Sequence, residues 1–207
     1  MSNPNDRLKT VRTLLWVLVA LAVVGVAALI LIPRQSASPP TATQTAPVQA
    51  SIGGPFTLVG GDGKPFSSSA LTGKPHVMFF GFTRCGDVCP TTLARLVNLR
   101  KQAGGDDKFD IVFVTIDPKH DGPEEVGQYA EAFNSPIIGL TGSPAQIDRV
   151  KKQYGIFAEP SHHPMPGQEM DHTATVLLFD RDGKFVSTIA PNEPDSAALD
   201  KLKRITT

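Results

Sequence analysis

Two cysteines, Cys85 and Cys89, are the residues of this 207-residue chain whose type and spacing most directly suggest chemistry. Three residues separate them, so one turn of helix would place both sulfur atoms on the same face. Pro90 suits the first position of a helix, which makes Cys89 the expected N-cap residue. The N-terminus of a helix stabilises a thiolate, and the thiolate is both the nucleophilic and the metal-binding form of cysteine.

Three interpretations of the cysteine pair are open at this point. A structural disulfide would close a loop too short to constrain the unfolded chain much. Redox thiols suit an oxidising compartment, although the usual redox motif has two intervening residues rather than three. A soft-metal site would need a further ligand, because two thiolates rarely complete one.

The histidines are the candidates for that further ligand. His76 begins a buried apolar run and is expected to be structural, and His120 lies in a charged loop and is expected to be solvated. His172 lies directly before a predicted strand, where it is either a ligand or an ordinary loop residue. The loop at residues 161–171 holds further soft or borderline donors, which suit copper but are otherwise ordinary surface: His162, His163, Met165 and Met170.

The rest of the domain alternates predicted strands and helices. Continuous apolar runs predict buried strands at residues 76–82 and 111–116, with a third at 137–141. Helical spacing and end signals predict helices at 91–102, 123–133, 143–155 and 195–205. Hairpins are expected at 56–66 and 173–189. This order predicts an α/β, thioredoxin-like fold with a central mixed sheet flanked by helices, and places the cysteines at a strand's carboxyl end, where open sheets bind ligands.

The N-terminal part of the chain has a different composition. Residues 14–32 form a run of 19 positions in which only Gly25 lies outside the hydrophobic set. A helix of that length spans roughly 28 Å, close to the hydrocarbon thickness of a bilayer, so we expect a transmembrane anchor. Basic residues before the run predict a cytoplasmic segment at 1–13 and an exported remainder. A cleaved signal peptide is the alternative, although its apolar region is usually about 7–15 residues long.

A linker and one domain are expected after this run. Residues 33–50 contain four prolines among small polar residues and predict an extended tether. Residues 51–207 carry 16 basic and 19 acidic residues, and the whole chain has a net charge of zero, which argues against a nucleic-acid partner.

Two cysteines are too few for a disulfide scaffold or a four-cysteine zinc site. The short N-terminus leaves no room for a mitochondrial presequence, so we expect a bacterial inner-membrane protein with its domain in the periplasm.

Three motifs, in this order, resemble those of the Sco/SenC family of membrane-tethered, thioredoxin-like copper proteins. They are GFTRCGDVCPTTL at residues 81–93, TIDP at 115–118 and DHTAT at 171–175. The resemblance covers about positions 52–205. It implies that Cys85, Cys89 and His172 bind one copper ion, as Cu(I) or Cu(II). It also implies a role in assembling the Cu(A) centre of cytochrome c oxidase subunit II.

The resemblance leaves two functions open: a copper metallochaperone, or a thiol–disulfide oxidoreductase that keeps the acceptor's cysteines reduced. Other periplasmic copper chaperones or thiol oxidoreductases are then expected partners. Asp87, between the cysteines, is expected to tune the site without ligating. Gly86 stands where the family commonly has proline, which loosens the loop. The four donors at 162, 163, 165 and 170 are a candidate for a second, weaker copper site.

Overall fold

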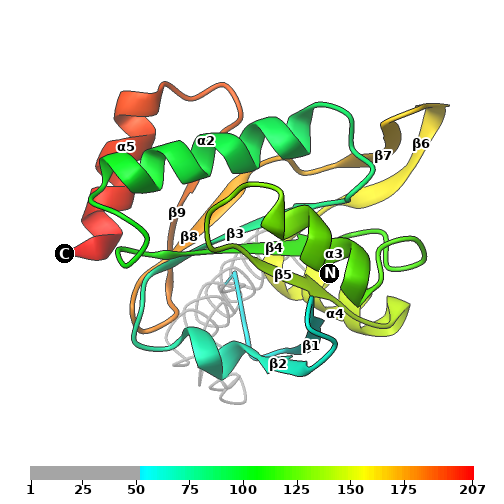
Figure 1. Ribbon diagram of the computed structural model, residues 1–207, viewed down its shortest axis with the longest axis horizontal. Coiled ribbons are helices and arrows are strands. Elements are labelled where there is room, and N and C mark those ends of the chain that lie inside the picture. The colour runs from blue at the N-terminus through cyan, green and yellow to red at the C-terminus, as the bar shows by residue number, and fades with distance from the viewer. Residues whose placement is uncertain (1–51) are drawn as a thin grey trace, which may run out of the picture. The chain divides into compact units, whose positions relative to one another are not determined.

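A seven-stranded mixed sheet with the order β2-β1-β5-β4-β3-β8-β9 forms the centre of the domain (Figure 1). The computed structural model describes residues 52–207. The sheet strands are β1 (Thr57–Gly60), β2 (Pro65–Ser67), β3 (His76–Gly81), β4 (Asp110–Thr115), β5 (Ile138–Thr141), β8 (Val176–Phe179) and β9 (Phe185–Ile189). The pairs β3–β4 and β4–β5 are parallel, whereas β1 and β8 join them antiparallel. The predicted α/β fold with a mixed sheet is therefore confirmed.

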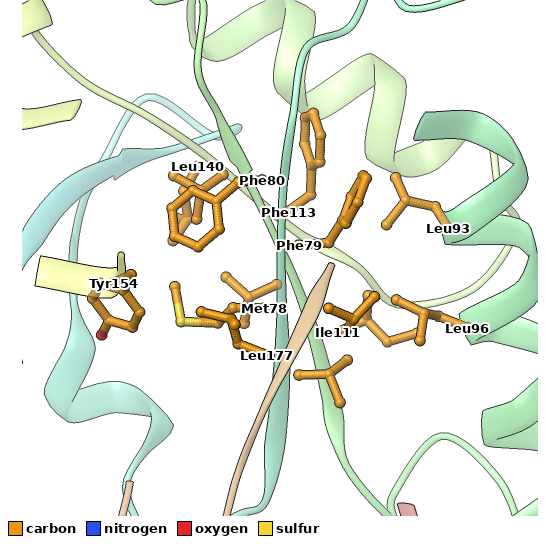
Figure 2. Packing of buried hydrophobic residues seen from close by; sticks show 14 of the residues in the cluster. Met78, Phe79, Phe80, Leu93, Leu96, Ile111, Phe113, Leu140, Tyr154 and Leu177 are labelled. Atoms are coloured by element: carbon orange, nitrogen blue, oxygen red, sulfur yellow. The ribbon is translucent and has the colours of Figure 1, made fainter. Parts of the chain in front are cut away.

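Helices cover both faces of this sheet. They are the short 3-10 helix η1 (Ser68–Leu71), α2 (Val88–Gln102), α3 (Pro123–Glu131), α4 (Pro144–Tyr154) and α5 (Asp195–Thr206). Strand β3 is buried along its whole length, and its side chains alternate between the two faces. Figure 2 shows Phe79 directed towards Leu93 of α2, and Met78 and Phe80 on the side of Tyr154 of α4. Phe113 packs on Tyr129 of α3, with ring centroids 5.1 Å apart. This packing fixes the carboxyl ends of β3 and β4, and the loop that carries Cys85 follows the end of β3.

The start of α2 corrects one sequence prediction. The helix begins at Val88 with Asp87 as its N-cap residue, so Cys89 is the second helical residue and Pro90 the third. Asp87 has the non-helical dihedral angles φ −144° and ψ −71°. Proline is tolerated anywhere in a first turn, because the N–H groups there have no partner within the helix. Pro90 therefore did not mark the first position.

The segment predicted as a loop at 161–171 is a second correction. It belongs to a separate two-stranded sheet formed by β6 (Ala158–Met165) and β7 (Gln168–His172). His172 ends β7, and the next strand begins only at Val176 rather than at residue 173. Prolines and polar residues along this segment hide the alternation that would have predicted strands.

The predicted anchor at residues 14–32 and linker at 33–50 lie outside the described residues. Within residues 52–207, no helix is long and apolar enough to cross a membrane.

Candidate metal and thiol site

The two cysteines occupy the first turn of α2 and the loop before it. Cys89 is fully buried, whereas Cys85 is partly exposed, and both thiols are free. The Cys89 backbone N–H donates to Cys85 Sγ at 3.3 Å, which is the helix N-terminus stabilising a sulfur. A Cβ at Gly81, the last residue of β3, would lie 2.7 Å from Cys89 Sγ, so only glycine leaves room for that sulfur.

His172 reaches the same sulfur from the other side, although it lies 83 residues away in sequence. Its Nε2 is 3.7 Å from Cys89 Sγ, and its Nδ1 is 3.1 Å from the carbonyl oxygen of Thr173. A proton on Nδ1 would be donated to that carbonyl and leave the Nε2 lone pair free to bind a metal ion, whereas a proton on Nε2 would be donated to a cysteine sulfur. The rings of Phe79 and Phe82 meet the imidazole edge-on, with centroids 6.3 and 6.0 Å away, and fix its orientation.

The sulfur–nitrogen spacing matches that of two ligands on one metal ion. Metal–sulfur and metal–nitrogen bonds of about 2.3 and 2.0 Å at an angle of about 120° place the ligand atoms about 3.7 Å apart. Among the described residues, no group of three His, Cys, Asp or Glu side chains already has the geometry of a complete metal site. Cys85, Cys89 and His172 must therefore shift to enclose one ion.

The two thiols have opposite pKa shifts. The hydrogen bond from Cys89, assisted by His172 and nearby backbone N–H groups, lowers the pKa of Cys85 to about 4, although burial opposes it. The same hydrogen bond and burial raise the pKa of Cys89 far above its usual value. At neutral pH the pair therefore consists of a Cys85 thiolate and a Cys89 thiol. Cys85 is the reactive sulfur because it is charged and the more exposed of the two.

Asp121 anchors the loop that carries Cys85 to the ends of the neighbouring strands. This residue was not identified from the sequence. This fully buried carboxylate accepts from the Thr83 backbone N–H at 3.0 Å and from the Thr83 hydroxyl at 2.6 Å. The carboxylate also accepts from the Thr115 hydroxyl at 2.6 Å, and the backbone carbonyl oxygen of Asp121 accepts from the Thr141 hydroxyl at 2.6 Å. The ends of β4 and β5 and the loop after β3 thus meet at one residue. Asp121 lies three residues after the end of the TIDP motif, and nothing in the local sequence marked it as part of the site.

A second polar cluster fixes the residue before Cys85. Asp117, from the TIDP motif, accepts from Arg84 Nη2 at 2.8 Å and lies 2.8 Å from His120 Nδ1. His120 is 55% exposed, so the expectation of a solvated loop residue holds, with one ion-pair partner added. His76 is buried and stacks on Phe179 with ring centroids 4.9 Å apart, as expected of a structural residue.

The β6–β7 hairpin closes the open side of the site. The Gly86 N–H donates to the Gly167 carbonyl oxygen at 3.0 Å. Gly167, in the hairpin turn, has φ +83°, and a Cβ there would lie 2.8 Å from the Gly86 nitrogen. Glycine at 86 therefore does more than loosen the loop, because proline would remove this hydrogen bond.

A pocket of about 370 Å³, open to solvent, lies between the cysteine loop, the start of α2 and the β6–β7 hairpin. It is lined by Phe82, Cys85, Asp87, Val88, Phe157, Gly167, Gln168, Met170, Asp171, His172 and Ala174. The exposed side chain of Asp87 lies at its edge, and its backbone N–H helps to lower the pKa of Cys85. Asp87 thus acts on the thiolate mainly through the main chain.

The four auxiliary donors are placed differently from one another. Met170 is partly buried and lines the pocket, whereas Met165 is 56% exposed at the end of β6 and His162 is exposed. The side chain of His163 lies outside the described part of the chain. A second copper site formed by these residues stays a prediction.

The fold and the site define a class of protein: a thioredoxin-like α/β domain with a dithiol at a helix N-terminus and a histidine facing it. The family model for SCO1/SenC matches residues 44–207. The chain therefore belongs to the SCO1/SenC family.

Individual relatives agree with this assignment. The chain is 39% identical to Bradyrhizobium japonicum ScoI, solved with copper bound, with a TM-score of 0.66 over 74% of this chain and 99% of that one. BsSco, described as a member of the Sco family of cytochrome c oxidase assembly proteins with a disulfide switch, is 25% identical, with a TM-score of 0.59 over 76% and 94%. The mitochondrial protein SCO2 of Saccharomyces cerevisiae is 33% identical over 73% of this chain, which spans 52% of that relative.

Proposed function

We propose that this protein is a copper chaperone that binds one copper ion through Cys85, Cys89 and His172. It delivers that copper to the Cu(A) centre of cytochrome c oxidase subunit II. The observation that carries the proposal is the 3.7 Å approach of His172 Nε2 to Cys89 Sγ, with Cys85 hydrogen bonded to Cys89. Relatives solved with copper bound support the choice of metal.

The three residues have distinct roles in holding this cargo. Two sulfurs and one imidazole form the soft, three-coordinate set that suits Cu(I), and Cu(II) would take a further, harder ligand. Cys89 is buried in the first turn of α2 and stays in place during transfer, whereas two aromatic rings orient His172 for ligation. Cys85 faces the pocket and is the ligand that an incoming thiol of the acceptor displaces first.

A second function, thiol–disulfide exchange, is favoured by the asymmetry of the two thiols. The Cys85 thiolate attacks an acceptor disulfide and forms a mixed disulfide, and one acceptor sulfur leaves as a thiolate. Cys89 then attacks Cys85, which releases the second acceptor sulfur and leaves a Cys85–Cys89 disulfide. The acceptor gains two electrons and this protein loses two. The disulfide switch of BsSco supports this alternative.

We place the protein in a bacterial inner membrane, with one span at residues 14–32, the N-terminus in the cytoplasm and the copper domain in the periplasm. The basic residues before the apolar run support this orientation. In that compartment the dithiol must be kept reduced before it can take copper.

Titration of the reduced protein with Cu(I) and with Cu(II) tests the two functions. His172→Ala is expected to lower copper affinity more than about 100-fold, the upper end for losing a group that merely supports a ligand. Oxidation of the dithiol should persist, because both sulfurs remain. His120→Ala is the control, since His120 pairs with Asp117 outside the pocket. Unchanged copper affinity in His172→Ala would refute the ligand assignment and leave thiol exchange as the function.

A further inference from the structure

We infer that the mouth of the pocket, defined as Val88, Phe157, Asp87 and Asp171, docks an apolar and basic polypeptide loop of the acceptor that carries the receiving cysteine. This inference rests on the proposed function, because copper or electrons pass to the acceptor only when its sulfur reaches Cys85. It adds the chemistry by which the acceptor is recognised.

Exposed hydrophobic side chains gather at this mouth. Within residues 52–207 the large exposed ones are Val88, Phe157, Met165 and Val186. Val88 is 40% and Phe157 55% exposed, and both line the pocket that contains Cys85 and His172. Met165 ends β6, in the hairpin that closes the pocket. Exposed apolar surface costs solubility, and its grouping around a reactive sulfur marks an interaction surface.

Each of the two apolar residues lies next to a proposed ligand, either in the sequence or through backbone hydrogen bonds. Val88 is the first residue of α2 and directly precedes Cys89. The Phe157 backbone exchanges two hydrogen bonds with Thr173, the neighbour of His172, at 3.2 and 3.0 Å. Figure 1 shows the β6–β7 hairpin beside the N-terminal end of α2. A partner that contacts Val88 and Phe157 is therefore within reach of the Cys85 sulfur.

The charges of the mouth select a basic partner. Asp87 and Asp171 are exposed at the pocket, and no lysine or arginine is among the residues that line it. Arg84, the nearest basic residue in the sequence, is paired with Asp117 at 2.8 Å. A lysine or arginine beside the acceptor's cysteine would meet two carboxylates that have no ion pair within residues 52–207, although Asp87 accepts a hydrogen bond from the Thr91 hydroxyl at 3.5 Å. A second copy of this chain, bound through the same face, would instead bring four carboxylates together, and an anionic lipid surface would also be repelled.

The test uses the reduced, copper-free, full-length protein and short synthetic peptides that carry one cysteine as a mixed disulfide with thionitrobenzoate. The Cys85 thiolate attacks the peptide sulfur, the disulfide to thionitrobenzoate breaks, and thionitrobenzoate leaves with the electron pair and is measured by its absorbance. One peptide has leucine and lysine beside the cysteine. A second has glycine for leucine, and a third has glutamate for lysine. Each rate is divided by that of the mixed disulfide of mercaptoethanol, which corrects for thiol reactivity.

We expect the leucine–lysine peptide to react about tenfold faster than the glutamate peptide at low salt, with the difference shrinking in high salt. Val88→Ser and Phe157→Ser should each reduce the leucine preference about fivefold or more, as expected for loss of an apolar contact. Val186→Ser is the matched control, because Val186 is 48% exposed on β9 and does not line the pocket. Asp87→Asn with Asp171→Asn should abolish the lysine preference, whereas Asp182→Asn, at an exposed turn, should keep it.

Equal normalised rates for the three peptides would overturn the inference. So would an effect of Val186→Ser as large as that of Val88→Ser. Sedimentation that shows a dimer dissociated by Val88→Ser would assign the mouth to a second copy and also overturn it. Copper titration separates this failure from that of the proposed function. Copper bound without any peptide preference refutes docking alone, whereas no copper binding refutes the chaperone function whatever the peptides show.

Discussion

The segment that carries the cysteines and the segment that carries His172 are held in place in different ways. The cysteine loop continues from β3, which is buried along its whole length, and Asp121 ties it to β4 and β5 through three fully or partly buried threonines. His172 lies in a separate two-stranded sheet, which touches the loop through the Gly86–Gly167 hydrogen bond. Two-stranded hairpins are marginally stable by themselves, so this one depends on its contacts with the loop and with the aromatic rings.

This difference teaches how one site can hold a metal firmly and still release it. The hydrogen bonds of Thr83 to the buried Asp121 anchor the start of the cysteine loop on the main sheet, although the loop itself is largely exposed. A peripheral hairpin supplies the third ligand and can separate from the sulfurs at a lower free-energy cost than the buried strands at the centre of the main sheet. The comparison predicts that damage to the loop acts on the stability of the fold, whereas damage to the hairpin acts on metal affinity.

Asp121→Ala should give the largest effect. It leaves the partly buried N–H and hydroxyl of Thr83 and the buried hydroxyl of Thr115 without their acceptor, each at about 1–3 kcal/mol, so the free energy of unfolding should fall by about 3 kcal/mol or more. Asp121→Asn keeps an acceptor oxygen and similar volume, and should lose clearly less. Urea unfolding of both variants measures the effect. If Ala were no more harmful than Asn, the loop would not be held by this network.

Gly167→Ala should lower copper affinity, in addition to the backbone strain that it shares with its control. Its Cβ would lie 2.8 Å from the Gly86 nitrogen, so the hairpin must move away from the cysteine loop, and we expect copper affinity to fall about tenfold. Gly183→Ala is the matched control, because Gly183 has a similar φ of +72° with open space around it. Both variants carry left-handed strain of about 1–2 kcal/mol. Equal copper affinities in the two would show that the hairpin contact does not position His172.

The smallest expected effect is that of the hairpin residue His172 on the pKa of Cys85, which the pH dependence of Cys85 alkylation measures. The pKa of about 4 predicts a thiolate, and hence a nearly constant rate with iodoacetamide, between pH 6 and 8. A thiol with an ordinary pKa would gain about tenfold per pH unit below that pKa. Cys89 is the largest cause of the lowered pKa and His172 a lesser one. His172→Ala should therefore raise the pKa of Cys85 less than Cys89→Ala does, and the reverse order would mean that the hairpin controls the thiolate.

Much of the fold followed from local signals in the sequence. The apolar runs at β3 and β4 and the Ser143–Gln146 capping box of α4 identify their elements directly, and the structure has them. The glycine turns at 60–63 and 181–183 join the strand pairs β1–β2 and β8–β9 as predicted. These elements depend on side-chain periodicity and turn chemistry over a few residues, which one sequence displays.

The β6–β7 hairpin could not be predicted in this way. Its segment contains three prolines and mostly polar residues, so no apolar pattern marks the strands. Its position depends on tertiary contacts, of its turn with Gly86 and of its end with Cys89. The start of α2 was misplaced for a related reason. Pro90 is compatible with several positions of a first turn, and the loop anchored at Thr83 decides which one it takes.

The sequence by itself determined the alternation of strands and helices, the position of the dithiol at a strand's carboxyl end, and, through three ordered motifs, the family. Only the tertiary structure brought His172 within 3.7 Å of Cys89 across 83 residues and placed Asp121 beneath the loop. It alone separated the thiols into a reactive Cys85 and a buried Cys89. Long-range distances and burial are set by packing between elements, and no local pattern of residue types encodes them.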